Sequence, residues 1–285
     1  MTTSTVEGLA QEAERHGIWF ESDGVRLFAI DVGRGHPIVF LHGGLADHRA
    51  TLFRVGEVAT SHRLLAPDLR GSGRSVYAGT LSWDRLADDV DALLAHLRIE
   101  RAVVGGTSMG SAVALRFGLR HPRRTSGLVL MSPVYPGKDR GLTEAQRAAM
   151  RAMDEAGQRA LQQGLDAMRP LFERLPPPIR DAAIEMMLGF DAGSVATTTH
   201  FLATNAQPID TVSELALIDA PVMIVPGIDP EHPAEVADLY ARHVRHAIVV
   251  DPTSADLPER IGRFCDGLDW HFAASSCSCG RGAHH

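Results

Sequence analysis

The chain has 285 residues, of which 45% are hydrophobic and 22% charged, the composition of a globular protein with a sizeable core. Its formal net charge is −7 at pH 7, and lysine and arginine form no basic run. Nucleic acids and anionic membranes bind basic patches, so we expect neither as a partner and expect a small-molecule substrate instead. Homo-oligomerisation is left open.

The segment before residue 18 is polar and lacks the apolar core of a signal peptide, and no stretch approaches 18 uninterrupted apolar residues. The first cysteine is Cys265, so no disulfide framework spans the body of the chain. We therefore expect a cytoplasmic protein.

Short apolar runs predict the strands. Runs at 18–22 and 25–32 are separated by the turn pair Asp23-Gly24, which is typical of a hairpin. The run at 37–41 is continuous rather than alternating, which indicates a strand buried on both faces. Similar runs predict further strands at 63–67, 102–106, 127–132, 222–226 and 247–250.

Helical patterns lie between most of these runs. One predicted helix begins near Trp83, after Ser82 as its N-cap, and another begins near Met109 and ends before Pro122. Strands alternating with helices predict an α/β fold with a mostly parallel, doubly wound sheet of eight strands.

The alternation stops between residues 137 and 208, where only helical patterns are found. About 70 residues is too long for a loop, so we predict a helical cap at 137–208, inserted after the sixth strand, on a core formed by 1–136 and 209–272. Methionines in the cap either line an adaptable apolar pocket or pack the cap against the sheet. They are Met150, Met153, Met168, Met186 and Met187.

The last 13 residues, 273–285, are rich in small residues, and we expect a disordered tail. Cys277, Cys279, His284 and His285 leave a zinc site as the alternative, although one residue between the cysteines is not the usual zinc spacing.

Ser108 is the candidate nucleophile. It lies in Gly106-Thr107-Ser108-Met109-Gly110, between a predicted strand and a predicted helix, and such a tight turn presents the serine hydroxyl outward. The flanking glycines avoid clashes with neighbouring elements, and the free N–H of Met109 at the helix start can stabilise an oxyanion. The alternative is a serine that merely caps this helix.

Two glycine-containing loops follow the third and fourth predicted strands. In Leu41-His42-Gly43-Gly44, the N–H of Gly44 is the expected second oxyanion donor, and His42 either orients this loop or acts as a base. In the second loop, residues 68–75, we expect Asp68 and Arg70 to stabilise the loop rather than react.

These three blocks occur in the order and with the separations that are typical of the α/β-hydrolase superfamily, in its capped branch. The chain resembles this family from about residue 18 to residue 270. The resemblance implies an acid after the strand at 222–226, and Asp229 in Gly227-Ile228-Asp229-Pro230 matches that position, one residue closer to the glycine than usual. A turn-forming role for Asp229 ahead of Pro230 is the alternative.

The family's histidine usually follows the last strand, but residues 250–258 contain none. Without a base, a serine hydroxyl is a poor nucleophile at neutral pH. His232, three residues beyond Asp229, is the best substitute; His243, His246 and His271 are expected to lie too far away. Alternatively, the chemistry is non-hydrolytic or lost, or the usual histidine has been replaced in this sequence.

We therefore predict a hydrolase that uses Ser108, Asp229 and His232, with Gly44 and Met109 as oxyanion donors, on an ester, thioester, lactone or activated ketone of a small, largely apolar substrate. The alternative is an α/β-hydrolase-fold protein that performs lyase-like chemistry or only binds a ligand. No dinucleotide fingerprint is present, so no cofactor is expected. No metal is expected either, because the spacings of His42, His48, Asp229 and His232 match no metal signature.

Overall fold

The structure is a computed structural model that describes residues 15–204 and 206–275, with the backbone alone for 269–275. The strands are β1 (Gly17–Ser22), β2 (Val25–Gly33), β3 (Pro37–Leu41), β4 (Arg63–Pro67), β5 (Ala102–Thr107), β6 (Thr125–Met131), β7 (Val222–Val225) and β8 (Ala247–Val249). The α-helices are α2 (His48–Val55), α3 (Trp83–His96), α4 (Met109–Arg120), α5 (Glu144–Gln163), α6 (Pro177–Leu188), α7 (Ala192–Ala203), α8 (Ala234–His243) and α9 (Leu257–Ser275). Short 3₁₀ turns are η1 (Gly56–Thr60), η2 (Pro122–Arg124), η3 (Leu165–Phe172) and η4 (Val212–Leu217).

All eight strands form one sheet in the order β1-β2-β4-β3-β5-β6-β7-β8. Strand β2 pairs antiparallel with both of its neighbours, whereas the pairs from β4 to β8 are parallel. The predicted fold class, a mostly parallel eight-stranded sheet with helices on both faces, is confirmed. Every predicted strand is present, with ends that differ by at most two residues.

Both faces of the sheet are covered. Along β3, Val39 and Leu41 belong to the cluster formed with α3, α4 and α8, while Ile38 and Phe40 belong to the cluster formed with α2 and α9. Successive side chains of a strand point to opposite faces, so a strand buried on both sides is apolar at every position. This packing explains why the sequence of β3 does not alternate.

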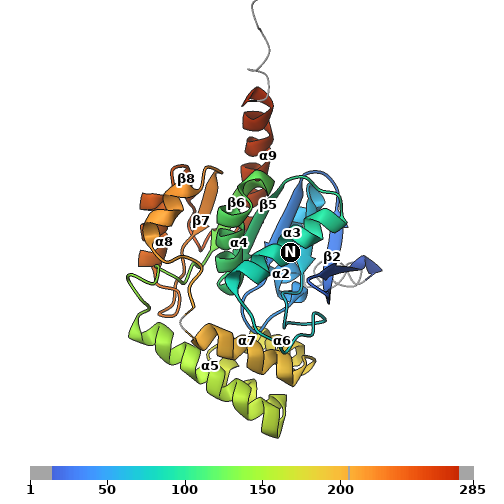
Figure 1. The fold of residues 1–285 in the computed structure, drawn as a ribbon, viewed down its shortest axis with the longest axis vertical. Helices are drawn as coiled ribbons and strands as arrows, with labels where there is room; N and C mark the ends of the chain where they lie inside the picture. The colour runs from blue at the N-terminus through green and yellow to red at the C-terminus, as the bar shows by residue number, and fades with distance from the viewer. Residues whose placement is uncertain (1–14, 205, 276–285) are drawn as a thin grey trace, which may run out of the picture.

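Helices α5, α6 and α7 and the turn η3 lie between β6 and β7 in the chain, and Figure 1 shows them at the end of the sheet opposite to α9. Of the five methionines, Met168 and Met187 are fully buried in the cluster that these elements form, and Met150 is buried against the main core. This burial favours the packing interpretation for these three residues over the pocket interpretation.

Helix α9 continues to Ser275, so the first three residues of the predicted tail are helical, and His271 lies within the helix rather than after it. The remainder of the predicted tail, with Cys277 and Cys279, lies outside the described residues. No helix in the described part of the chain is long and apolar enough to cross a membrane.

Arg70 is the largest fully buried side chain, and it makes a bidentate ion pair across the core. Its Nε and Nη2 atoms lie 2.9 Å and 2.6 Å from the two carboxylate oxygens of Asp89 on α3, and Nη2 also donates to the carbonyl of Ser22 at 2.9 Å. The loop after β4, strand β1 and helix α3 are thereby connected. This geometry agrees with the expected loop-stabilising role of Arg70.

Replacing Arg70 with Met is expected to lower the free energy of unfolding by about 3–5 kcal/mol, because the Asp89 carboxylate is left buried and unpaired. Urea denaturation followed by circular dichroism measures the loss. The control is Arg245→Met, which removes an ion pair with Asp219 whose side chains are 62% and 82% exposed. Equal losses in the two variants would contradict the expectation.

Candidate active site

Ser108 lies in a strained turn between β5 and α4. Its φ of 54° and ψ of −114° correspond to the first central position of a type II′ turn, which glycine normally occupies. Its N–H donates to the carbonyl of Met131 at 2.9 Å, and its carbonyl accepts from the N–H groups of Ser111 and Ala112. The backbone of the serine is thus fixed by β6 on one side and by α4 on the other.

The glycines on either side of Ser108 allow the helix to approach the sheet. A Cβ at Gly110 would lie 2.4 Å from the carbonyl oxygen of Leu41, and a Cβ at Gly106 would lie 2.4 Å from the carbonyl carbon of Gly110. No side chain fits at such distances. The first N–H groups of α4, which have no intrahelical acceptor, therefore start directly beside the end of β3.

His232 and Asp229 form a continuous hydrogen-bonded chain with Ser108. The Nδ1 of His232 lies 2.8 Å from Oδ1 of Asp229, and its Nε2 lies 2.9 Å from Oγ of Ser108. Nδ1 of His232 carries the proton and donates it in a hydrogen bond to Asp229. Nε2 is therefore unprotonated, and its lone pair faces the serine hydroxyl. This arrangement can remove the proton of Ser108, and it shows that a histidine three residues from the acid can bridge the two groups.

The turn between Asp229 and His232 explains how this bridge is possible. Oδ1 of Asp229 accepts the N–H groups of Glu231 and His232 at 3.0 Å and 2.9 Å, and the carbonyl of Asp229 accepts the N–H of His232 at 3.0 Å. The chain folds back so far that a Cβ at Gly227 would lie 2.3 Å from Cβ of His232. Gly227 therefore has no space for a side chain in this turn. The carboxylate of Asp229 both closes the turn and faces the imidazole of His232, so its geometry fits either interpretation of this residue.

Burial alone would raise the pKa of Asp229, but the charge of His232 and the hydrogen bonds from His232 and Glu231 lower that pKa below its ordinary value. The side chain of Asp229 is 47% exposed and that of His232 is 24% exposed. The acid is consequently an ionised carboxylate at neutral pH, in a site that solvent can reach from the Asp229 side.

His42 lies in the loop after β3 and is fully occupied there. Its Nε2 accepts the N–H of Leu69 at 2.9 Å, so Nδ1 carries the proton that is donated to the carbonyl of Gly43 at 2.7 Å. Burial lowers its pKa, which keeps the ring neutral. With both nitrogens engaged, the geometry fits the loop-orienting interpretation of His42 and leaves no lone pair for the serine.

The loop of residues 43–45 contacts both Ser108 and the helices between β6 and β7, namely α5, α6, α7 and the turn η3, which are called the cap below. A Cβ on Gly43 would lie 3.7 Å from Cβ of Ser108, and one on Gly44 would lie 3.3 Å from Leu202 of α7. Leu45 has a positive φ of 58° and is buried in the apolar cluster of the cap. The loop that is expected to supply an oxyanion donor is therefore packed between the nucleophile and the cap helices.

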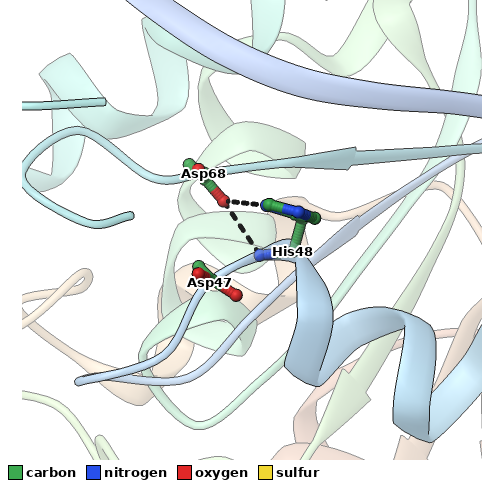
Figure 2. A group of neighbouring side chains, drawn as sticks. All are labelled: Asp47, His48 and Asp68. Carbon is green, nitrogen blue, oxygen red and sulfur yellow. Dashed lines mark hydrogen bonds and ion pairs between the residues drawn. The ribbon is translucent and has the colours of Figure 1, made fainter. Parts of the chain in front are cut away.

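Asp47, His48 and Asp68 form a buried group of metal-ligand type, the one such group in the described part of the chain (Figure 2). Oδ1 of Asp68 accepts the N–H of His48 at 2.9 Å and faces Nδ1 of His48 at 2.8 Å, while Oδ2 accepts the N–H of Arg74 at 2.8 Å.

The carboxylate of Asp47 accepts the backbone N–H and the guanidinium of Arg49, which occupy the lone pairs that a cation would need. Burial would raise the pKa of Asp68, but the hydrogen bond and charge of His48 lower it. The donor set of this group therefore fits loop stabilisation, as expected for Asp68, better than it fits a metal.

The other histidines weighed as bases lie elsewhere. Nδ1 of His243 donates to the carbonyl of Leu239 within α8, and the carbonyl of His246 accepts the N–H of Val222. The side chain of His271 lies outside the described residues. The sequence identifies Gly227 only as the glycine that precedes the acid, two residues after β7, and does not reveal its role in the turn.

A cavity of about 760 Å³ lies beside α3 and α7, and neither Ser108 nor His232 lines it. Trp83 and Phe201 form part of its wall, and ion pairs of Arg116 with Asp84 and of Lys138 with Asp210 lie at its surface. This cavity does not reach the hydrogen-bonded chain of Ser108, His232 and Asp229. We therefore do not assign it as the place where the carbonyl group of a substrate would bind.

Comparison with known proteins shows the family of the chain. Residues 36–169 match a family model described as the alpha/beta hydrolase fold. The AB hydrolase superfamily protein YisY of Bacillus subtilis (strain 168) is 32% identical over 214 residues, which cover 71% of this chain and 77% of that protein. The chain belongs to the α/β-hydrolase family.

Two further similarities concern proteins named for hydrolysis. The 2-hydroxymuconate semialdehyde hydrolase of Pseudomonas sp. (strain CF600) is 34% identical to this α/β-hydrolase over 127 residues, 41% of this chain and 45% of that enzyme's length. An esterase from Exiguobacterium antarcticum has a TM-score of 0.71 at 21% identity, covering 90% of this chain and 99% of that chain, which is a similarity of fold. Membership in this family supports hydrolase activity.

Replacing Ser108 with Gly is expected to give a protein more stable than the Ser108→Ala variant, because only glycine removes the strain of φ 54°. The expected difference is about 1 kcal/mol in the free energy of unfolding, measured by urea denaturation. The same pair of substitutions at Ser111, inside α4, is the control and is expected to favour Ala by a similar amount. An Ala variant at least as stable as the Gly variant at position 108 would show that the turn is unstrained.

Proposed function

We propose that this α/β-hydrolase uses Ser108 as a nucleophile, His232 as its general base and Asp229 to orient the histidine. The observation that supports this most strongly is the 2.9 Å separation of His232 Nε2 from Ser108 Oγ. The family's usual histidine is absent after the last strand, and His232 supplies an imidazole for the same role. The alternative of lost or non-hydrolytic chemistry depended on that missing base, and the contact removes its main support.

The reaction begins when Ser108 Oγ attacks the carbonyl carbon and His232 Nε2 takes the hydroxyl proton. Asp229 stabilises the imidazolium through Nδ1. The backbone N–H groups of Met109 and Gly44 donate to the oxyanion, assisted by the positive end of α4. His232 then returns the proton to the leaving group, and water, activated by the same nitrogen, hydrolyses the acyl-enzyme.

We infer a small, largely apolar substrate with an ester, thioester, lactone or activated ketone carbonyl. Ser108 adjoins the loop of Gly43, Gly44 and Leu45, and the apolar Leu202 of α7 lies against Gly44. The names of the similar proteins, an esterase and the hydrolase of a semialdehyde, agree with a carbonyl substrate.

A fluorophosphonate probe, which phosphonylates activated serines, is expected to label the wild type but not Ser108→Ala, tested from about pH 6 to 9 so that neutral histidine is sampled. His232→Gln is expected to reduce the labelling rate by about 10²-fold or more. His200→Gln, a change of a histidine that is 65% exposed and paired with Asp154, is the control and should label like the wild type. Wild type that stays unlabelled throughout this range would refute the activated serine.

Asp229→Asn is expected to lower the labelling rate by about 10²–10⁴-fold, because the amide no longer favours the tautomer with a free Nε2. The pKa of Asp229 lies below its ordinary value, so the wild-type carboxylate stays ionised above about pH 5. The rates are compared at about pH 8 to 9, where histidine side chains are generally neutral and the carboxylate of Asp229 is ionised. A variant that labels at the wild-type rate there would contradict the orienting role of Asp229.

A further inference from the structure

Gln146 connects the cap to the turn that carries His232. It lies in the first turn of α5 and is 1% exposed. Its Oε1 accepts the N–H of Thr143 at 2.9 Å, closing the capping box of this helix. Its Nε2 donates to the carbonyl of Val134 at 2.8 Å and to the carbonyl of Glu231 at 3.3 Å.

The hydrogen bond from Gln146 to Glu231 is made to the peptide unit that joins Glu231 to His232. The carbonyl of this unit accepts from Gln146, and its N–H, which belongs to His232, donates to Oδ1 of Asp229 at 2.9 Å. Both ends of one peptide unit are thus hydrogen-bonded, one to the cap and the other to the acid. This peptide unit ends at the Cα of His232, so a displacement of the unit would move the imidazole with it.

We propose that Gln146 is a positioning residue for His232, through which the cap sets the distance between the imidazole and Ser108. This inference rests on the proposed function, since it concerns the base of that reaction. The presence of glutamine rather than glutamate at position 146 agrees with this positioning role. Glutamate and glutamine both serve at this position of a capping box, because either offers the acceptor oxygen. Only the amide also has two N–H donors for the carbonyls of Val134 and Glu231.

The test is Gln146→Glu, which keeps the side-chain shape and the oxygen that accepts from Thr143 but removes both donors. We expect the fluorophosphonate labelling rate to fall at least about tenfold relative to wild type at about pH 8. Burial beside two carbonyl oxygens raises the pKa of a carboxyl group, so the introduced acid should protonate as the pH falls. The protonated form regains one donor, and the ratio of variant to wild-type rates should rise towards pH 6.

Two control variants separate positioning from general damage to the cap. Gln162→Glu makes the same change at an exposed site of α5, and Arg174→Gln removes the exposed ion pair between the cap and the Glu231 side chain. Both should change the labelling rate by no more than about twofold. A loss in either control as large as that in Gln146→Glu would mean that any disturbance of the cap has the same effect, which would overturn the inference.

A second measurement does not depend on serine reactivity. Diethyl pyrocarbonate modifies neutral imidazoles, and mass spectrometry gives the rate at His232 relative to the exposed His200 of the same molecule. Gln146→Glu should raise this relative rate several-fold at about pH 8, because the imidazole leaves its two hydrogen-bond partners.

An unchanged rate at His232 would overturn the positioning role, whatever the serine probe shows. A raised rate combined with an unlabelled wild-type serine would instead refute the proposed function and leave the positioning role standing.

Discussion

The close approach of α4 to the end of β3 is the constraint on which the rest of the site depends. Gly106 and Gly110 have no space for a Cβ, since backbone atoms of α4 and β3 occupy it at 2.4 Å. This contact lets the chain turn from β5 into α4 at Ser108. The turn requires a positive φ at Ser108, which few residues other than glycine tolerate. The helix start, the loop after β3 and Ser108 therefore occupy one small volume, where the negative charge that develops in the proposed reaction would meet several N–H groups.

Different parts of the molecule hold the proposed nucleophile and the proposed base. The core holds Ser108, through the hydrogen bond from its N–H to the carbonyl of Met131 and the packing of α4 on the sheet. The turn that carries His232 is contacted by the cap as well, through Gln146 and, at the surface, through Arg174. The cap also packs against the loop of Gly44 and Leu45. Helices α5 and α7 and Arg174 thus support both the loop after β3 and the turn that carries His232.

Much of this could be predicted from the sequence. Short apolar runs predict all eight strands, and the glycines around Ser108 predict the turn, because burial and local crowding restrict the residue types at these positions. The cap was visible only as a stretch without strands, and its packing could not be derived from spacing. His232 could be proposed by elimination, but its contact with Ser108 depends on the reversal at Gly227, a three-dimensional property. The role of Gln146 was equally hidden, since Thr143 and Gln146 indicate only a helix start.

The placement of Asp229 and His232 on one four-residue turn has a mechanical consequence. When acid and base come from separate loops, thermal motion can disturb two independent distances, and each disturbance alone interrupts proton transfer. Here the carboxylate and the imidazole lie on the same turn, and the turn itself contains their hydrogen bonds. The hydrogen bond from His232 to Ser108 is the one link of this chain that joins separate elements. In the proposed reaction, the tautomer of the imidazole is therefore set within the turn, and its distance to the serine is set by the packing around the turn.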